Sequence, residues 1–165
     1  MRVYIPATFG MLKSLDSDGL IHARGGWAFA VTPELTEFYT SGDVEELEAI
    51  AFDEAARTSI RLLTAGDEAD FPHRRVVISA DVDTAEGHPE MGESVVKLAA
   101  PVEVTEVAAL HVDIREAEEA TAAAIANIDA AELGDEDAEL IVGDAQDNYM
   151  AFYDPSELPF LVELL

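Results

Sequence analysis

The sequence of 165 residues contains no cysteine, and this absence excludes several kinds of site at once. Without cysteine the chain has no disulfide bonds, no thiolate nucleophile and no cysteine-ligated zinc. Its four histidines are too scattered for helical His-x-x-x-His or Glu-x-x-His ligation, so a metal site could arise only by tertiary convergence. We therefore predict neither a cofactor nor a metal site.

Long apolar runs are also missing. The amino terminus MRVYIPAT has no apolar signal core, and no run approaches the roughly 18 apolar residues that suggest a membrane-spanning helix. We find no fixed-period repeat and no linker rich in Gly, Ser or Pro. Because the length suits one ordinary domain, we expect a single cytoplasmic domain over residues 1–165.

Basic residues are scarce, and acid dominates the composition. The chain has 35 acidic residues against nine basic ones, which gives a formal net charge of −26. A field of this sign repels nucleic-acid phosphates and anionic membranes, so we expect neither as a partner. Solubility or a proteome-wide acidic bias, including adaptation to high salt, would explain the charge without a specific function. A partner with a basic surface is the functional explanation, and imitation of DNA's charge is its extreme form.

The longest stretch of helical periodicity runs from Asp43 to Leu63. Its apolar residues recur on one stripe at 100° per residue, and Asp43 with Glu46 has the spacing of a capping box. We predict a long central helix at about 43–65 that lies across a sheet. If its apolar face were free, it could instead form the interface of a homodimer.

Short runs of β-branched and apolar residues between turn residues predict the strands. We expect strands at 2–6, 27–31, 74–82, 94–99, 107–113, 140–142 and 149–153, and an exposed loop at 84–92. Shorter helices are expected at 8–15, after Thr32, after Asp113 and at 155–164. This order predicts an α+β two-layer sandwich, in which a mixed β-sheet is packed by the long helix and the shorter helices.

The segments MRVYIPAT, VAALHVD and YDPSEL, with several of the predicted elements, resemble a family of short, acidic, uncharacterised actinobacterial proteins. The resemblance covers most of the chain. It implies a domain of unknown function in a bacterial cytoplasm. It implies no activity, no catalytic residue and no cofactor.

His111 and Asp113 are the candidate catalytic pair. They lie two apart on a predicted strand, so they share a face at the strand's end, where open sheets often present ligand-binding groups. A neighbouring carboxylate would raise the pKa of the histidine and could orient it as an acid, a base or a metal ligand. Alternatively, Asp113 caps the following helix with Glu116 while His111 packs at the sheet's margin. The pair has no placed nucleophile, so its catalytic signal is weak.

Thr8, Arg57 and Arg61 are weaker candidates for binding. Thr8 follows a strand at a helix start, where backbone N–H groups could bind an anion, although capping explains it as well. Arg57 and Arg61 share the polar face of the long helix. They could pair with Asp53 and Glu54, or they could anchor a partner's carboxylate.

No set of residues completes a catalytic constellation, and the charge has one sign. Our leading hypothesis is therefore a non-enzymatic, soluble interaction or accessory protein with a strongly acidic surface. The alternative is a small enzyme or a small-molecule-binding domain with a cleft near His111 and Asp113.

Overall fold

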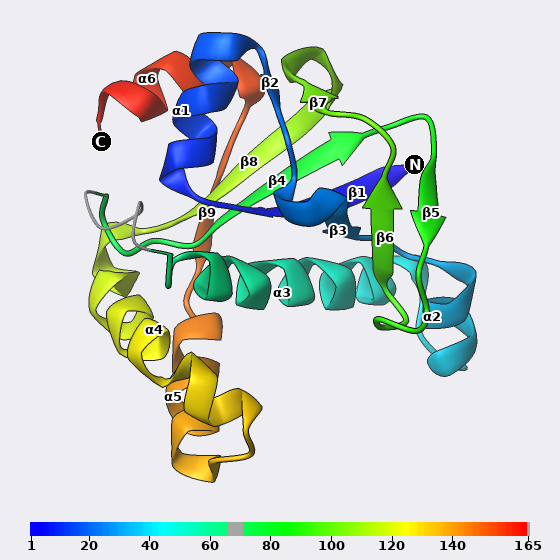
Figure 1. Cartoon of the computed structure of the whole chain (residues 1–165), viewed down its shortest axis with the longest axis vertical. Helices are drawn as coiled ribbons and strands as arrows, with labels where there is room; N and C mark the ends of the chain where they lie inside the picture. The colour runs from blue at the N-terminus through cyan, green and yellow to red at the C-terminus, as the bar shows by residue number, and fades with distance from the viewer. Residues whose placement is uncertain (66–70, 165) are drawn as a thin grey trace.

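The computed structural model describes residues 1–65 and 71–164, and a seven-stranded sheet lies at its centre (Figure 1). The strand order is β5-β6-β3-β1-β4-β8-β9. Their bounds are β1 (Arg2–Ala7), β3 (Trp27–Phe29), β4 (Val76–Asp81), β5 (Ala85–Gly87), β6 (Val95–Leu98), β8 (Val107–Asp113) and β9 (Met150–Tyr153). A second, small sheet pairs β2 (Leu20–Ile21) with β7 (Val102–Glu103).

Every recorded strand pair within the described ranges is antiparallel, where we expected a mixed sheet. The reason lies in the connection from β3 to β4. These two strands are joined by a helical crossover and run in the same direction, but β1 lies between them and is antiparallel to both. The crossover therefore creates no adjacent parallel pair.

Six α-helices surround the sheet in the part of the chain that the structure describes. Their bounds are α1 (Phe9–Asp18), α2 (Pro33–Phe38), α3 (Val44–Leu62), α4 (Glu118–Glu132), α5 (Glu136–Gln146) and α6 (Leu158–Glu163). Short 3₁₀ turns lie at Arg24–Gly26, Val104–Glu106, Arg115–Ala117 and Pro155–Glu157. Asp43 caps α3 by accepting a hydrogen bond of 2.9 Å from the backbone N–H of Glu46, which satisfies one of the free donors at the helix start.

The two faces of the sheet pack against different helices. Alternate residues of β1 show this: Tyr4 packs with Ala51 and Ala55 of α3, whereas Val3 and Ile5 belong to the core formed with α1 and α6. In Figure 1, α3 runs below the central strands and α1 and α6 lie above them. The α+β sandwich with a long helix packed on the sheet is confirmed. On the apolar face of α3, Leu47, Ala51 and Ala55 are buried within the chain, so this part of the face is not free to form a dimer interface.

α4 and α5 form a hairpin beside α3 (Figure 1). Its core contains Ile60 of α3 with Ala124, Ile128 and Val142. The strand expected at 140–142 is wrong, because these residues lie in the middle of α5. A run of three apolar residues has no clear period, and here Val142 is buried against α4 while Leu140 faces solvent. The expected loop at 84–92 likewise contains β5.

Candidate functional site

A cleft of about 380 Å³ opens beside His111. The central strands form its floor, and α3 and β9 form its walls. The strand register creates this arrangement, since Tyr4 of β1 pairs with Ser79 of β4, and His111 of β8 pairs with Phe152 of β9. Because side chains alternate across a strand, these residues reach the α3 face.

Aromatic rings surround His111. The ring centroid of Phe52, on α3, lies 4.8 Å from that of His111, and the centroid of Phe152 lies 5.8 Å from it on β9. Tyr4 meets Phe52 edge to face, with a centroid distance of 5.9 Å. Burial lowers the pKa of His111 to about 4, and the charge of Arg2 acts in the same direction. His111 is therefore neutral at pH 7.

Ser79 is the hydrogen-bonding partner of His111. Ser79 Oγ and His111 Nε2 lie 2.8 Å apart, the spacing of a nucleophile and its general base. Ser79 lies in the middle of β4, however, and only 2% of its surface is exposed. Because Ser79 is almost fully buried, its hydroxyl is poorly exposed for attack on a substrate, and its observed contact is the one with His111.

Carboxylates of α3 line the cleft's rim. Glu45, Glu48 and Asp53 contribute three, and the hydroxyl of Tyr4 donates a 3.3 Å hydrogen bond to Glu48 Oε2. Burial and then the charge of Glu48 raise the pKa of Tyr4 to about 12. The pKa of Asp53 is also raised. Partial burial is the main cause, nearby Arg75 opposes it, and Asp147 adds to it.

One cation, Arg2, stands at the cleft among the described residues, and it is already paired. Its Nε lies 2.7 Å from Asp81 Oδ1, and its Nη2 lies 3.1 Å from Asp81 Oδ2. This two-point contact satisfies both carboxylate oxygens of Asp81. The cleft therefore combines aromatic walls with an excess of negative charge.

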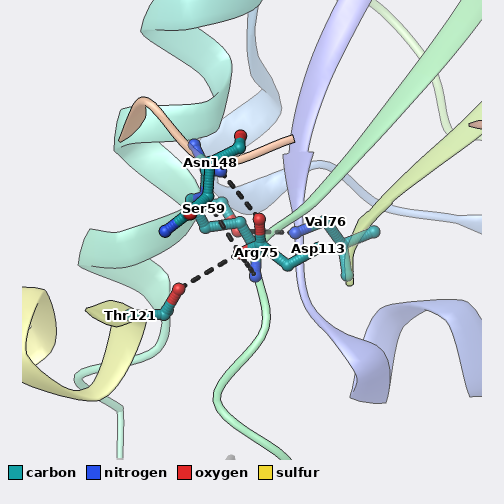
Figure 2. A network of polar contacts seen from close by, with 6 residues as sticks. All are labelled: Ser59, Arg75, Val76, Asp113, Thr121 and Asn148. Carbon is teal, nitrogen blue, oxygen red and sulfur yellow. Dashed lines mark hydrogen bonds and ion pairs between the residues drawn. The ribbon is translucent and has the colours of Figure 1, made fainter. Parts of the chain in front are cut away.

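Asp113 does not join His111 in the cleft. Figure 2 shows its carboxylate held by Arg75, which donates from its backbone N (2.7 Å), Nε (2.9 Å) and Nη2 (2.7 Å). Thr121 Oγ1 donates a further bond of 3.2 Å to Asp113, and Arg75 Nη2 also donates to the carbonyl of Asn148 at 3.1 Å. Both charged side chains are almost fully buried.

This buried pair corrects two expectations. Asp113 does not cap the following helix, because Arg75 and Thr121 occupy its oxygens and the chain enters a 3₁₀ turn before α4. The predicted rise in the pKa of His111 is also wrong, since Asp113 pairs with Arg75 and burial lowers the pKa of His111 instead. The pair instead joins the residue before β4 to β8, α4 and the segment before β9.

Ser59 provides a second polar link in Figure 2. Its Oγ donates to the carbonyl of Ala7 at 2.7 Å and accepts from the backbone N–H of Val76 at 3.0 Å. One hydroxyl thus ties α3 to the ends of β1 and β4. These contacts hold α3 in place over the sheet.

The structure places Thr8 at the start of α1. Its Oγ1 accepts a 3.3 Å hydrogen bond from the backbone N–H of Met11, and the residue is fully buried. The side chain of Thr8 therefore caps this helix.

Arg57 and Arg61 point to the α4–α5 hairpin. The pairing with Asp53 and Glu54 that we expected is therefore not the one that they form. Arg57 binds Glu139 through both terminal nitrogens, at 2.7 and 2.8 Å. Arg61 pairs with Asp129 and Glu132. The hairpin lies along the side of α3, so acids from distant sequence meet these arginines. They also line a surface hollow of about 560 Å³.

Sequence reasoning identified His111 but missed the residues around it. Tyr4, Phe52 and Phe152 were visible only as apolar positions of a strand or a helix. Ser79 was hidden inside an apolar strand, although its polar side chain in such a run was a usable signal. Neither the order of the strands nor their register can be read from one sequence, so the convergence of these residues was not predictable.

Within residues 1–65 and 71–164, no group of three or more His, Asp or Glu side chains could hold a metal ion. No helix in the same ranges is long and apolar enough to cross a membrane.

Comparison with known proteins places the chain in a family. A model described as a family of unknown function, DUF6912, matches residues 1–162. The chain belongs to this family. The resemblance to an uncharacterised family is thereby confirmed, and DUF6912 brings no assigned activity with it. No curated protein and no solved structure matches the chain. The function must therefore be argued from geometry and charge.

Proposed function

We propose that this protein is a non-enzymatic interaction or accessory protein whose acidic surface binds a partner with a basic surface. The observation that supports this best is the pairing of its arginines with acidic residues of the same chain. Five of them form ion pairs inside the chain: Arg2, Arg57, Arg61, Arg74 and Arg75. Few positive groups remain to oppose a basic partner, while the chain keeps a formal net charge of −26.

Electrostatics of this kind acts mainly on the rate and selectivity of association. An excess of one sign attracts an oppositely charged protein over a long range and repels anionic competitors. The attraction between exposed charges falls as salt shortens the Debye length, which is about 10 Å at 0.1 M ionic strength. Binding should therefore weaken as ionic strength rises.

The setting that we propose for this interaction is the cytoplasm of an actinobacterium. The resemblance in the sequence supports it. Fractionation of a cell that encodes the protein, followed by immunodetection, would test the compartment.

Co-purification at two ionic strengths tests the function. The full chain is immobilised, exposed to a cell extract at low salt, and washed at low or high salt. We expect a defined basic protein to be retained at low salt and released at high salt. The matched control is an unrelated folded protein of similar size and net charge, which should not retain that protein.

Two results would contradict the proposal. One is retention of the same proteins by the unrelated acidic control, which would reduce the effect to bulk charge. The other is the absence of any salt-sensitive partner, with the chain recovered alone at both ionic strengths.

A second candidate function is a small enzyme or a small-molecule-binding domain that uses the His111 cleft. The cleft of about 380 Å³ beside a neutral histidine favours it, and the burial of Ser79 favours binding over catalysis. A His111→Ala variant should then lose the thermal stabilisation that a small ligand confers on the wild type, while its own fold remains intact. If the variant only loses stability, His111 has a structural role.

A further inference from the structure

The cleft around His111 has the lining of a cation site. Phe52 and Phe152 both contact the His111 ring, and Tyr4, which contacts Phe52, completes the aromatic wall. Phe152 lies on β9, at the end of the strand order, and 64% of it is exposed. Aromatic faces attract cations through the negative charge of the ring face. An exposed phenylalanine at the mouth of a cleft is available to a partner's side chain.

The charged groups that line the cleft also favour a cation. Glu45, Glu48 and Asp53 line the cleft with carboxylates, and Arg2 is held by Asp81 in a two-point contact. His111 adds no positive charge to the cleft at pH 7, because its pKa is lowered to about 4. A cation would therefore meet opposite charge at the rim and aromatic faces inside.

We propose that this cleft receives one arginine side chain from the basic partner, an inference that rests on the proposed function. A guanidinium group is planar, so it can stack on an aromatic ring while its N–H groups bind a carboxylate. Phe52 and Phe152 supply rings, and Glu48 supplies a carboxylate within the same cleft. Lysine fits less well, because its ammonium is compact and strongly hydrated.

The direct test is a titration of the ¹⁵N-labelled full chain with three short peptides of the same length, followed by NMR. The peptides carry arginine, lysine or citrulline at one position and are otherwise uncharged. Citrulline keeps the shape of arginine without its charge. We expect the arginine peptide to shift the amide signals of the residues that line the cleft, and to bind more tightly than either of the others.

Two variants locate the binding. Phe152→Ala removes one aromatic wall at an exposed position, and Glu48→Gln removes one charge while keeping an acceptor for Tyr4. Each should weaken binding of the arginine peptide about 2- to 5-fold. Phe160→Ala on α6 and Glu136→Gln on α5 are matched controls, exposed and outside the cleft, and should leave binding unchanged.

Each other outcome overturns a stated part of the inference. Equal binding of the citrulline peptide would show that the cleft does not require a positive charge. Equal binding of the lysine peptide would show that the cleft does not prefer arginine to lysine. Equal losses in the controls would show that charge acts over the whole surface. If the Phe152→Ala variant retains the salt-sensitive basic partner as strongly as the wild type does, the inference that the cleft binds that partner is wrong, and the proposed function stands. If the arginine peptide binds but no basic protein is retained, the proposed function fails.

Discussion

Asp113 and His111 lie two residues apart on β8, and their surroundings differ: Asp113 faces a buried cation, and His111 faces uncharged groups. The carboxylate of Asp113 lies in the interior and accepts hydrogen bonds from three donors of Arg75. His111 lies among aromatic rings and bonds to the hydroxyl of Ser79, and its burial there favours the neutral form. A buried charge is tolerated only with a partner of opposite charge; Asp113 has such a partner in Arg75, whereas the hydrogen-bonding partner of His111 is the uncharged Ser79.

The lowered pKa of His111 predicts acid sensitivity. The folded protein holds this proton with a pKa of about 4, against an ordinary value of 6.5. Its contribution to stability is complete above pH 6.5 and is lost as pH falls to about 4, because the unfolded chain takes up the proton first. The loss is at most about 3 kcal/mol. Denaturation midpoints measured over this pH range should therefore fall more steeply for the wild type than for His111→Phe.

The His111→Phe variant needs one correction. It leaves the Ser79 hydroxyl without its partner, which costs about 1–3 kcal/mol at every pH. The informative quantity is thus the difference in stability between the wild type and the variant, followed as the pH changes. A constant difference would contradict the depressed pKa.

Breaking the buried Arg75–Asp113 pair should be costly. Asp113→Ala leaves the guanidinium of Arg75 buried without its carboxylate, and we expect a loss of about 3–5 kcal/mol in the free energy of unfolding. Arg2–Asp81, an ion pair with both side chains largely exposed, is the matched control. Asp81→Ala should cost less than about 1 kcal/mol. Similar losses in urea unfolding of the two variants would show that burial of the pair does not matter.

At the scale of elements, α3 connects the two parts of the molecule. One side packs Ala51 and Ala55 on the sheet, and Ile60 near its end enters the core of the α4–α5 hairpin. Ion pairs from Arg57 and Arg61 reinforce the second contact. The helix therefore has two apolar contacts, and its arginines face a hairpin from later in the chain.

Ile60 should be the key residue of that second contact. Ile60→Ala removes a fully buried side chain between α3 and the hairpin, so we expect a loss of about 2–5 kcal/mol. Hydrogen exchange should quicken most in α4 and α5, because their packing on α3 is weakened. Leu133→Ala, at a position that is 89% exposed, should change stability little. Unchanged protection in the hairpin would contradict this role of Ile60.

At the scale of the whole molecule, repulsion among carboxylates opposes folding. The chain carries a formal charge of −26, and compaction brings these charges together. Salt screens both this repulsion and the exposed ion pairs. Each exposed pair contributes less than about 1 kcal/mol, so relief of the repulsion should prevail.

We therefore expect sodium chloride to raise the melting temperature. For a chain of this size, each kcal/mol of relieved repulsion corresponds to a rise of about 2–4 °C. Scanning calorimetry over increasing salt measures the effect, and sucrose at equal osmolality controls for exclusion of solutes from the surface. A melting temperature that falls with salt would show that the ion pairs outweigh the repulsion.

The sequence by itself determined the local structure. Period, capping residues and turn residues are local signals, and they placed α3 behind Asp43, α1 behind Thr8 and β8 at residues 107–113. They failed at 140–142, where three apolar residues carry no period, and at Asp113, whose spacing matched a cap that it does not form.

Only the tertiary structure decided the site. Arg75 reaches Asp113 across 38 residues, Arg57 reaches Glu139 across 82, and the His111 cleft joins β1, β4, β8, β9 and α3. Such contacts depend on strand order and register, which are set by the packing of the whole core. Charge was known from composition alone. Only the folded structure shows where acidic residues and aromatic rings lie together, in the cleft beside His111.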